Sequence, residues 1–189
     1  MRRRTPAVGN AVLPVLPPVS LILGGARSGK SAHAEALARS SGLSLVYLAT
    51  AQALDEEMRG RIADHRARRG PDWRTIEAPL ALPAVLQEEI RPDHAIVVDC
   101  LTLWVTNLLL AGRDVAAAGA ELVAVLERRR GRVVLVANEV GLGIVPLGEL
   151  SRAFVDEAGR LHQRIAAVAD LVRLMVAGLP LDLKAPCTS

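Results

Sequence analysis

The stretch from Val19 to Ser31 reads VSLILGGARSGKS, and it joins a short strand-forming apolar run to a glycine-rich turn. Residues Gly24 to Ser31 match the phosphate-loop pattern G-x-x-x-x-G-K-[ST] in full, between an expected buried strand and an expected helix. In such a loop the backbone N–H groups surround the β-phosphate, and the N-terminus of the following helix adds a favourable field. Because the pattern is complete and lies in the right context, we predict a nucleoside triphosphate site rather than a chance glycine-rich turn.

Two side chains of this loop have defined roles in the pattern. Lys30 is expected to reach the β- and γ-phosphates, which makes it a candidate catalytic residue, and Ser31 is expected to ligate Mg²⁺. We expect the whole loop to contact the nucleotide, that is Gly24, Gly25, Ala26, Arg27, Ser28, Gly29, Lys30 and Ser31.

Beyond the loop, short apolar runs alternate with longer helical stretches. This alternation predicts an α/β fold, a single P-loop NTPase-like domain with a mostly parallel sheet flanked by helices. In such folds ligands bind at the carboxyl ends of the strands. The expected strands are residues 19–23, 45–49, 73–77, 95–99, 133–137 and 171–176, and the expected helices begin near Lys30 or span residues 55–69, 82–90, 101–110, 115–129 and 150–169.

The composition fits one globular domain. With 189 residues, 51% of them apolar, the chain can bury one compact core, which we place at residues 19–189 after a flexible proline-rich leader, residues 1–18. An aromatic content of 2% provides no stacking platform, so we expect no nucleic-acid partner. The longest relevant uncharged stretch, residues 100–112, is too short to span a membrane. Two cysteines form no disulfide framework, so the expected compartment is a reducing cytoplasm.

A magnesium site of this kind needs an acid at the end of a neighbouring strand. Asp99 closes the run AIVVD and is the candidate for that catalytic, metal-binding role. An aspartate in this position also suits the N-cap of the helix that follows. Glu139, after a later apolar run, either shares the site or is a plain loop carboxylate. The residues leave these alternatives open.

The sequence lacks the motifs that identify a signalling GTPase. The guanine motif N-K-x-D is absent, and the single D-x-x-G, Asp156–Gly159, falls inside an expected helix. A signalling GTPase is therefore disfavoured. A small-molecule kinase or a nucleotidyl transferase fits the sequence better.

A second cluster surrounds His65, which has Arg66, Arg68 and Arg69 directly after it. A neutral imidazole can attack phosphorus and form a phosphoramidate, while guanidiniums neutralise the leaving pyrophosphate. A solvated basic helix explains the same residues, and the pattern alone favours that plainer interpretation. The other histidines have no supporting cluster, and His33, on the helix after the loop, is more typical of a surface residue.

Taken together, several segments resemble one family, the bifunctional adenosylcobinamide kinase / adenosylcobinamide-phosphate guanylyltransferases of cobalamin biosynthesis. The resemblance runs in order from about Val19 to Lys184. Its most specific parts are H-R-x-R-R-G-x-x-W, which begins at His65, and N-E-V-G-x-G-I-V-P. The matching segments are GGARSGKSAHAEALA, VYLATAQ, DEEMRGRIADHRARRGPDWRTIE, VVDCLTLWVTNLL, VVLVANEVGLGIVP and FVDEAGRLHQRIAAVAD.

The resemblance implies a P-loop α/β domain, a homotrimer and two reactions. ATP or GTP first phosphorylates the aminopropanol hydroxyl of adenosylcobinamide, a corrinoid. GTP then guanylylates an enzyme histidine, and the GMP passes on to give adenosylcobinamide-GDP. The position that matches the guanylylated histidine is His65, which makes it the favoured candidate nucleophile.

The resemblance also implies nucleotide contacts outside the loop. Two departures from relatives concern this chain, because Asp64 stands where some relatives have a second histidine and Asp99 where some have glutamate. A carboxylate at Glu77 could bind guanine bidentately, hold a ribose, or be an exposed loop acid. The implied positions are Thr50, Ala51, Gln52, Arg66, Ala67, Arg68, Arg69, Glu77 and Asp99.

Two alternatives to this function remain at the level of sequence. One is a P-loop small-molecule kinase without guanylyl transfer, which would have no need of His65. The other is a nucleotide-binding regulatory protein that catalyses no reaction. The full set of candidate Mg²⁺ ligands disfavours it. For the corrinoid we expect an open, largely apolar groove, lined by the uncharged helix Leu101–Leu110 and the loop Gly141–Pro146.

Overall fold

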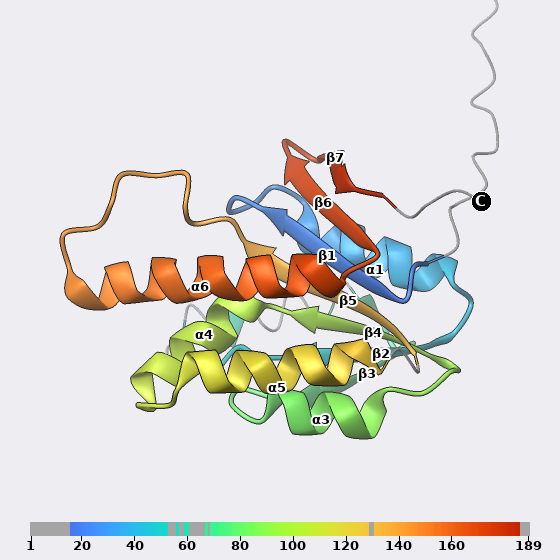
Figure 1. Cartoon of the computed structure of the whole chain (residues 1–189). Coiled ribbons are helices and arrows are strands. Elements are labelled where there is room, and N and C mark those ends of the chain that lie inside the picture. Colours follow the sequence, from blue (N-terminus) through green and yellow to red (C-terminus); the bar gives the residue numbers. More distant parts are fainter. Residues whose placement is uncertain are drawn as a thin grey trace, which may run out of the picture.

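A computed structural model of the chain describes residues 16–52, 56, 59–60, 67, 69–128 and 131–185. They form a seven-stranded sheet in the order β3-β2-β4-β5-β1-β6-β7, with helices on both faces (Figure 1). The strands are β1 (Val19–Gly24), β2 (Ser44–Ala49), β3 (Trp73–Glu77), β4 (His94–Asp99), β5 (Arg132–Asn138), β6 (Leu171–Val176) and β7 (Leu179–Lys184). The helices are α1 (Lys30–Ser40), α3 (Leu82–Glu89), α4 (Leu101–Leu110), α5 (Val115–Glu127) and α6 (Glu149–Val168).

The sheet is parallel except at one edge. Every pair of neighbouring strands from β3 to β6 is parallel, and only β6 and β7 pair antiparallel. The predicted α/β fold is therefore confirmed. Ala49 pairs in register with both Glu77 and Asp99, and Gly24 pairs with Asn138, so the predicted strand-end residues lie along one edge of the sheet.

Two apolar cores cover the two faces of the sheet. One core joins α1 to inward residues of the strands such as Tyr47 and Val97, and the other joins α3, α4, α5 and α6 to the opposite face. The central strands β1, β4 and β5 are buried almost throughout, which is why they appear in the sequence as continuous apolar runs. Apart from residues 55–69, which fall largely outside the described residues, the expected and observed bounds agree within two residues.

Residues just before β1 also pack on the sheet. Leu16 is 1% exposed and belongs to the α1 core, and the Pro18 carbonyl oxygen accepts a hydrogen bond from Val133 N at 2.8 Å. The packed chain thus extends to the N-terminal side of Val19, the expected start of the domain. Residues 1–15 of the expected leader lie outside the described residues.

Strand β7 is the one described strand that the sequence analysis missed. It pairs with β6 through a tight turn in which Ala177 and Gly178 have positive φ values of 52° and 81°, as two-residue hairpin turns require. The six residues of β7 are all exposed and include a proline, so they form no buried apolar run. The alternation of Leu179, Leu181 and Leu183 with polar or proline residues is the signal that identifies it.

Among the helices of the described residues, none has both the length and the apolar character that a membrane span demands.

Candidate active site

The glycine-rich loop lies between β1 and α1, as its pattern predicts. Gly24 and Gly29 have φ values of 152° and 93°, in the region that favours glycine. A Cβ on Gly24 would lie 2.5 Å from the Met175 carbonyl oxygen and 2.6 Å from Ser28 Oγ, so this position has no room for a side chain. At Gly25 an added Cβ would meet nothing within 4 Å. The loop is therefore held tightly against β6 at its start and is open at the next residue.

Lys30 begins α1, and its ammonium group turns back to the loop. Nζ donates a hydrogen bond to the Gly25 carbonyl oxygen at 2.6 Å, and the residue is 7% exposed. Burial lowers the pKa of Lys30, and the nearby Asp99 carboxylate opposes this shift. The two predicted catalytic residues of the phosphate site are thus close enough to interact. Ser31, the next residue of α1, is half-buried.

Asp99 is the last residue of β4, and its carboxylate is held by a side chain of β2. Tyr47 donates its hydroxyl proton to Asp99 Oδ2 at 2.9 Å. The N-cap of α4 is Cys100, with no side-chain hydrogen bond. The alternative role of Asp99 as the helix N-cap is therefore wrong. Its side chain instead faces the same side of the sheet as Lys30 and the loop.

These donors suit Mg²⁺. A hydroxyl and a carboxylate are hard oxygen ligands, and Mg²⁺ commonly uses one or two such groups together with substrate phosphates and water. In the described part of the chain there is no group of three or more His, Cys, Asp or Glu that could hold a metal ion. Ser31 and Asp99 could supply oxygen ligands of this kind.

The loop after β2 is fixed by buried hydrogen bonds to the neighbouring strand end. Thr50 is fully buried, and its Oγ1 donates to the Cys100 carbonyl oxygen at 2.7 Å and accepts from Cys100 N at 2.8 Å. The next residues, Ala51 and Gln52, are half-buried. The predicted Thr50–Gln52 segment thus lies beside Asp99, and the Thr50 side chain is already used in hydrogen bonds to Cys100.

Helix α4 ties this loop to the loop after β3. Asn107 Nδ2 donates to the Thr50 carbonyl oxygen at 2.8 Å and to the Pro79 carbonyl oxygen at 3.0 Å. Trp104 Nε1, one turn earlier, donates to the Leu80 carbonyl oxygen at 3.0 Å. Sequence reasoning missed both residues, although a buried amide and indole in the apolar run LTLWVTNLLL are the available signal.

Glu77 ends β3 with an exposed side chain, in register with Ala49. The structure therefore brings Thr50, Glu77 and Asp99 to the same edge as the phosphate loop. It does not place the nucleophile, because His65, Arg66 and Arg68 lie outside the described residues. Of the segment that follows His65, Ala67 is exposed and helical.

Arg69 is buried, although the sequence analysis expects it at the nucleotide. It is 4% exposed, and its guanidinium carbon lies 3.6 Å from the centre of the Tyr47 ring. Its carbonyl oxygen accepts a hydrogen bond from Arg39. Arg69 thus contacts Tyr47, the residue that holds Asp99.

The histidines outside the motif have structural contacts. His33 is half-buried rather than on the surface as expected, and its Nε2 accepts a hydrogen bond from Arg173 at 2.8 Å. Burial and then the Arg173 guanidinium lower its pKa. His94 Nδ1 bonds to a carbonyl oxygen of α3 at 2.8 Å. His162 is buried, and burial lowers its pKa.

Glu139 begins the long loop between β5 and α6. Its N–H donates to the Gly24 carbonyl oxygen at 3.0 Å, and its Oε1 accepts from Gly141 N at 2.7 Å. Glu139 is therefore joined to the phosphate loop through its backbone, while its carboxylate stabilises its own loop. This loop stands away from the sheet in Figure 1 and carries strongly exposed apolar side chains, namely Leu142, Ile144, Val145 and Leu147.

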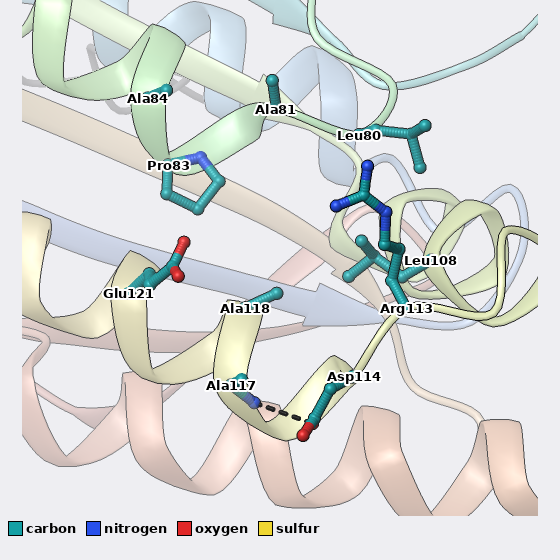
Figure 2. Close-up of a pocket in the computed structure, with 10 residues that line it drawn as sticks. All are labelled: Leu80, Ala81, Pro83, Ala84, Leu108, Arg113, Asp114, Ala117, Ala118 and Glu121. Carbon is teal, nitrogen blue, oxygen red and sulfur yellow. Dashed lines mark hydrogen bonds between the residues drawn. The ribbon is translucent and has the colours of Figure 1, made fainter.

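Two hollows lie on the helix-rich face near this edge. A hollow of about 190 Å³ between α4 and α6 is lined by Thr106, Leu109, Leu110, Leu150, Ser151 and Phe154. A larger one of about 390 Å³ lies between α3 and α5, and Figure 2 shows Arg113 and Glu121 extending toward it from different points. Helix α4 contributes Leu108 to the larger hollow and three residues to the smaller one, so the smaller hollow is the closer match to the expected corrinoid groove, although the loop Gly141–Pro146 lines neither.

The sheet order, the phosphate loop and the strand-end acid define a P-loop nucleotide-binding protein. The family model for cobinamide kinase / cobinamide phosphate guanyltransferase matches residues 20–183, and the chain belongs to this family of enzymes. A bifunctional adenosylcobalamin biosynthesis protein of Pseudomonas aeruginosa, CobP, is 59% identical over 167 residues, which cover 87% of this chain and 96% of that protein. The corresponding CobU of Salmonella typhimurium is 45% identical over 179 residues, covering 87% of this chain and 98% of that protein.

Solved structures support the fold independently. The flagellar accessory protein FlaH of Methanocaldococcus jannaschii has a TM-score of 0.52 and 15% identity, over 91% of this chain and 80% of that one. An ATPase from a type III secretion system of pathogenic bacteria has a TM-score of 0.53 and 12% identity, over 91% of this chain and 60% of that one. At this low identity, the two structures show the P-loop NTPase fold alone.

Proposed function

We propose that the chain performs two successive reactions on adenosylcobinamide, both at the loop between β1 and α1. In the first, ATP or GTP phosphorylates the hydroxyl of the aminopropanol arm. In the second, GTP transfers GMP through a guanylylated His65 to the cobinamide phosphate, which gives adenosylcobinamide-GDP. The observation that carries the proposal is the buried Lys30 between the phosphate loop and Asp99, in a chain of the cobinamide kinase / guanyltransferase family.

The kinase step uses the phosphate loop directly. The loop amides and Lys30 hold the β- and γ-phosphates while the substrate hydroxyl oxygen attacks the γ-phosphorus, its proton passes to solvent, and the nucleoside diphosphate leaves. Ser31 and Asp99 would hold Mg²⁺, which neutralises phosphate charge when bound. The Tyr47 hydroxyl, 2.9 Å from Asp99 Oδ2, keeps the carboxylate turned in one direction.

The transferase step uses His65 as a nucleophile. Its neutral ring nitrogen attacks the α-phosphorus of GTP, and pyrophosphate leaves. Arg66 and Arg68 of the same segment would neutralise that leaving group. A phosphate oxygen of the cobinamide phosphate then attacks the same phosphorus, the P–N bond breaks, and His65 is regenerated.

The nucleoside would lie along the strand ends next to the loop. Ala51 and Gln52, half-buried after β2, and the exposed Glu77 at the end of β3 would contact the base or the ribose. A carboxylate can accept from guanine N1–H and the exocyclic amine together, which would favour GTP over ATP. Thr50 supports this side of the site through its backbone, because its hydroxyl is bonded to Cys100.

The corrinoid would bind beside the phosphate loop on an apolar surface. The loop after β5 is joined to the phosphate loop by the Glu139 N to Gly24 O hydrogen bond, and it exposes Leu142 and Ile144 by 85% and 98%. The hollow between α4 and α6 offers a second apolar surface, with leucine and phenylalanine side chains. A large corrinoid substrate could cover both and direct its hydroxyl arm toward the loop.

Two further parts of the proposal concern the protein as a whole. A homotrimer is implied by the family resemblance, and the exposed leucines of edge strand β7 would suit a contact between copies. A cytoplasmic location fits a biosynthetic enzyme whose described Cys100 is a free thiol.

Intact-protein mass spectrometry after incubation with GTP and Mg²⁺ tests the function most directly. We expect the wild type to gain the mass of one GMP in an acid-labile bond, and His65→Ala to gain none. His33→Ala is the matched control, because it removes a histidine near the phosphate loop without removing the nucleophile, and it should still form the adduct. An adduct on His65→Ala would assign the nucleophile to another residue.

The same preparation separates the alternative function. A wild type that phosphorylates cobinamide with ATP but never forms a GMP adduct would be a small-molecule kinase without guanylyl transfer. A wild type that binds GTP with Mg²⁺ and does neither would overturn the proposed function.

A further inference from the structure

Tyr47 contacts residues from both of the regions that the two proposed reactions use. It is the single tyrosine of the chain, it lies on β2, and it is 3% exposed. Its hydroxyl donates to Asp99 Oδ2 at 2.9 Å, and its ring is covered by the Arg69 guanidinium at 3.6 Å. One side chain thus joins the metal-side acid to the end of the segment that carries His65.

The phenol can only act as a donor to Asp99. An ionised carboxylate only accepts hydrogen bonds, so the Tyr47 hydroxyl is the donor of this contact. A hydrogen bond to a carboxylate is among the stronger side-chain interactions. It holds Oδ2 against Tyr47 of β2, and no hydrogen bond from another described residue engages Oδ1.

The guanidinium of Arg69 lies on the Tyr47 ring, while its carbonyl oxygen is held by Arg39. Arg69 is 4% exposed, and among the described residues its buried Nε has no hydrogen-bond partner. The face of an aromatic ring attracts a guanidinium, and this attraction is stronger where water is excluded. Arg69 stands four positions after His65 in the sequence, so the length of the intervening chain limits how far His65 can lie from it.

We propose that Tyr47 is a positioning residue for both steps, whose hydroxyl fixes the Asp99 carboxylate and whose ring holds Arg69, the residue four positions after His65. This inference rests on the proposed function of Asp99 and His65. It concerns the placement of these groups, because Tyr47 itself is buried beneath them.

Two substitutions separate the hydroxyl from the ring. Tyr47→Phe keeps the surface on which Arg69 lies but removes the donor to Asp99, so we expect about tenfold more Mg²⁺ to be needed for half-maximal GTP binding. GTP affinity without Mg²⁺ should not change. Tyr47→Leu removes the ring as well, so it should also slow formation of the GMP adduct on His65 by about tenfold beyond Tyr47→Phe.

Trp73→Phe is the matched control. Trp73 packs edge-on against Tyr47, with ring centres 5.9 Å apart, so its truncation loosens the same cluster without removing the Tyr47 hydroxyl or ring. We expect this variant to lose stability but to keep the wild-type Mg²⁺ dependence. A Mg²⁺ requirement that rises equally in Trp73→Phe and Tyr47→Phe would overturn the proposal, because loosening alone would then explain it.

A second measurement needs no activity. Because the chain has one tyrosine, incorporation of 3-fluorotyrosine gives one ¹⁹F resonance from Tyr47. In the nucleotide-free protein, Asp99→Ala and Arg69→Met should each shift this resonance, whereas Glu121→Gln on α5 should not. A chemical shift that changes with neither substitution would refute the contacts of Tyr47 with Asp99 and Arg69. If the wild type formed no GMP adduct, the transferase function would fail, while the Mg²⁺ titration and the resonance would still decide the role of Tyr47.

Discussion

The side-chain nitrogen of Asn107 lies 2.8 Å from the Thr50 carbonyl oxygen, so the helix after β4 holds the loop after β2. The same nitrogen donates to the Pro79 carbonyl oxygen at 3.0 Å, and its two N–H groups therefore join two loops. These loops adjoin Gln52 and Glu77, the candidate contacts to the nucleoside. The spacing of those two side chains thus depends on a residue that belongs to neither loop.

Asn107→Ala should weaken nucleoside recognition more than phosphoryl transfer. It leaves two carbonyl oxygens without their donor in a site where Asn107 is 8% exposed, which costs about 1–3 kcal/mol of unfolding free energy. We expect the KM for GTP to rise several-fold, with a smaller change in kcat at saturating GTP. Urea unfolding and steady-state kinetics measure the two effects.

Leu126→Ala is the control for Asn107→Ala. Leu126 is fully buried on α5 and contributes to the core that supports α4, so its truncation costs about 2–5 kcal/mol without removing a hydrogen bond from either loop. Its KM for GTP should remain near that of the wild type. Equal increases in both variants would show that general destabilisation, and not the loss of the amide, sets the KM.

Gly24→Ala and Gly25→Ala should differ sharply although the residues are neighbours. A Cβ on Gly24 would lie 2.5 Å from a backbone oxygen of β6, which cannot move aside cheaply, whereas a Cβ on Gly25 meets nothing within 4 Å. We expect Gly24→Ala to lower the melting temperature of the nucleotide-free protein clearly and Gly25→Ala to change it little. Similar melting temperatures would mean that the start of the loop has more freedom than its contacts indicate.

The sequence predicts the residues at the carboxyl ends of the strands better than the buried contacts behind them. The loop pattern places Lys30, and the apolar run before Asp99 places that carboxylate, because parallel strands bring their carboxyl ends to one edge. These positions follow from local patterns that need no knowledge of packing. The same reasoning finds every described strand except β7, whose exposed residues form no buried run.

The contacts behind that edge could not be predicted in the same way. Tyr47 lies inside an apolar strand and Asn107 inside an apolar helix, so the sequence pattern assigns both to the core. Their hydrogen bonds to Asp99 and to two loops join residues far apart in the chain, and they depend on the register of β2 beside β4. Arg69 looks like part of an exposed basic segment, and only the structure places it on the Tyr47 ring.

Lys30→Met should weaken triphosphate binding strongly without unfolding the protein. Burial lowers the pKa of Lys30, which means that the folded chain holds this charge at a cost. A neutral side chain of similar length removes that cost, so we expect the nucleotide-free variant to melt at or above the wild-type temperature. Its affinity for GTP should fall by more than about tenfold, because a charge-assisted contact to phosphate is lost. A large fall in melting temperature would instead show that the Lys30 contact to Gly25 O stabilises the fold.

His33 should make the stability of the protein fall in mild acid. Burial and the Arg173 guanidinium lower its pKa below the ordinary value of 6.5, so as the pH falls through this range the unfolded chain binds the proton first. The urea midpoint should therefore decrease from about pH 7.5 to about pH 5.5. His33→Gln keeps an acceptor for Arg173 but cannot titrate, so its midpoint should decrease less. His162, whose pKa burial also lowers, accounts for the part that remains, and His33→Gln combined with His162→Gln should remove most of the decrease. If His33→Gln alone lost as much stability as the wild type over this range, the contact with Arg173 would not be what the acid disrupts.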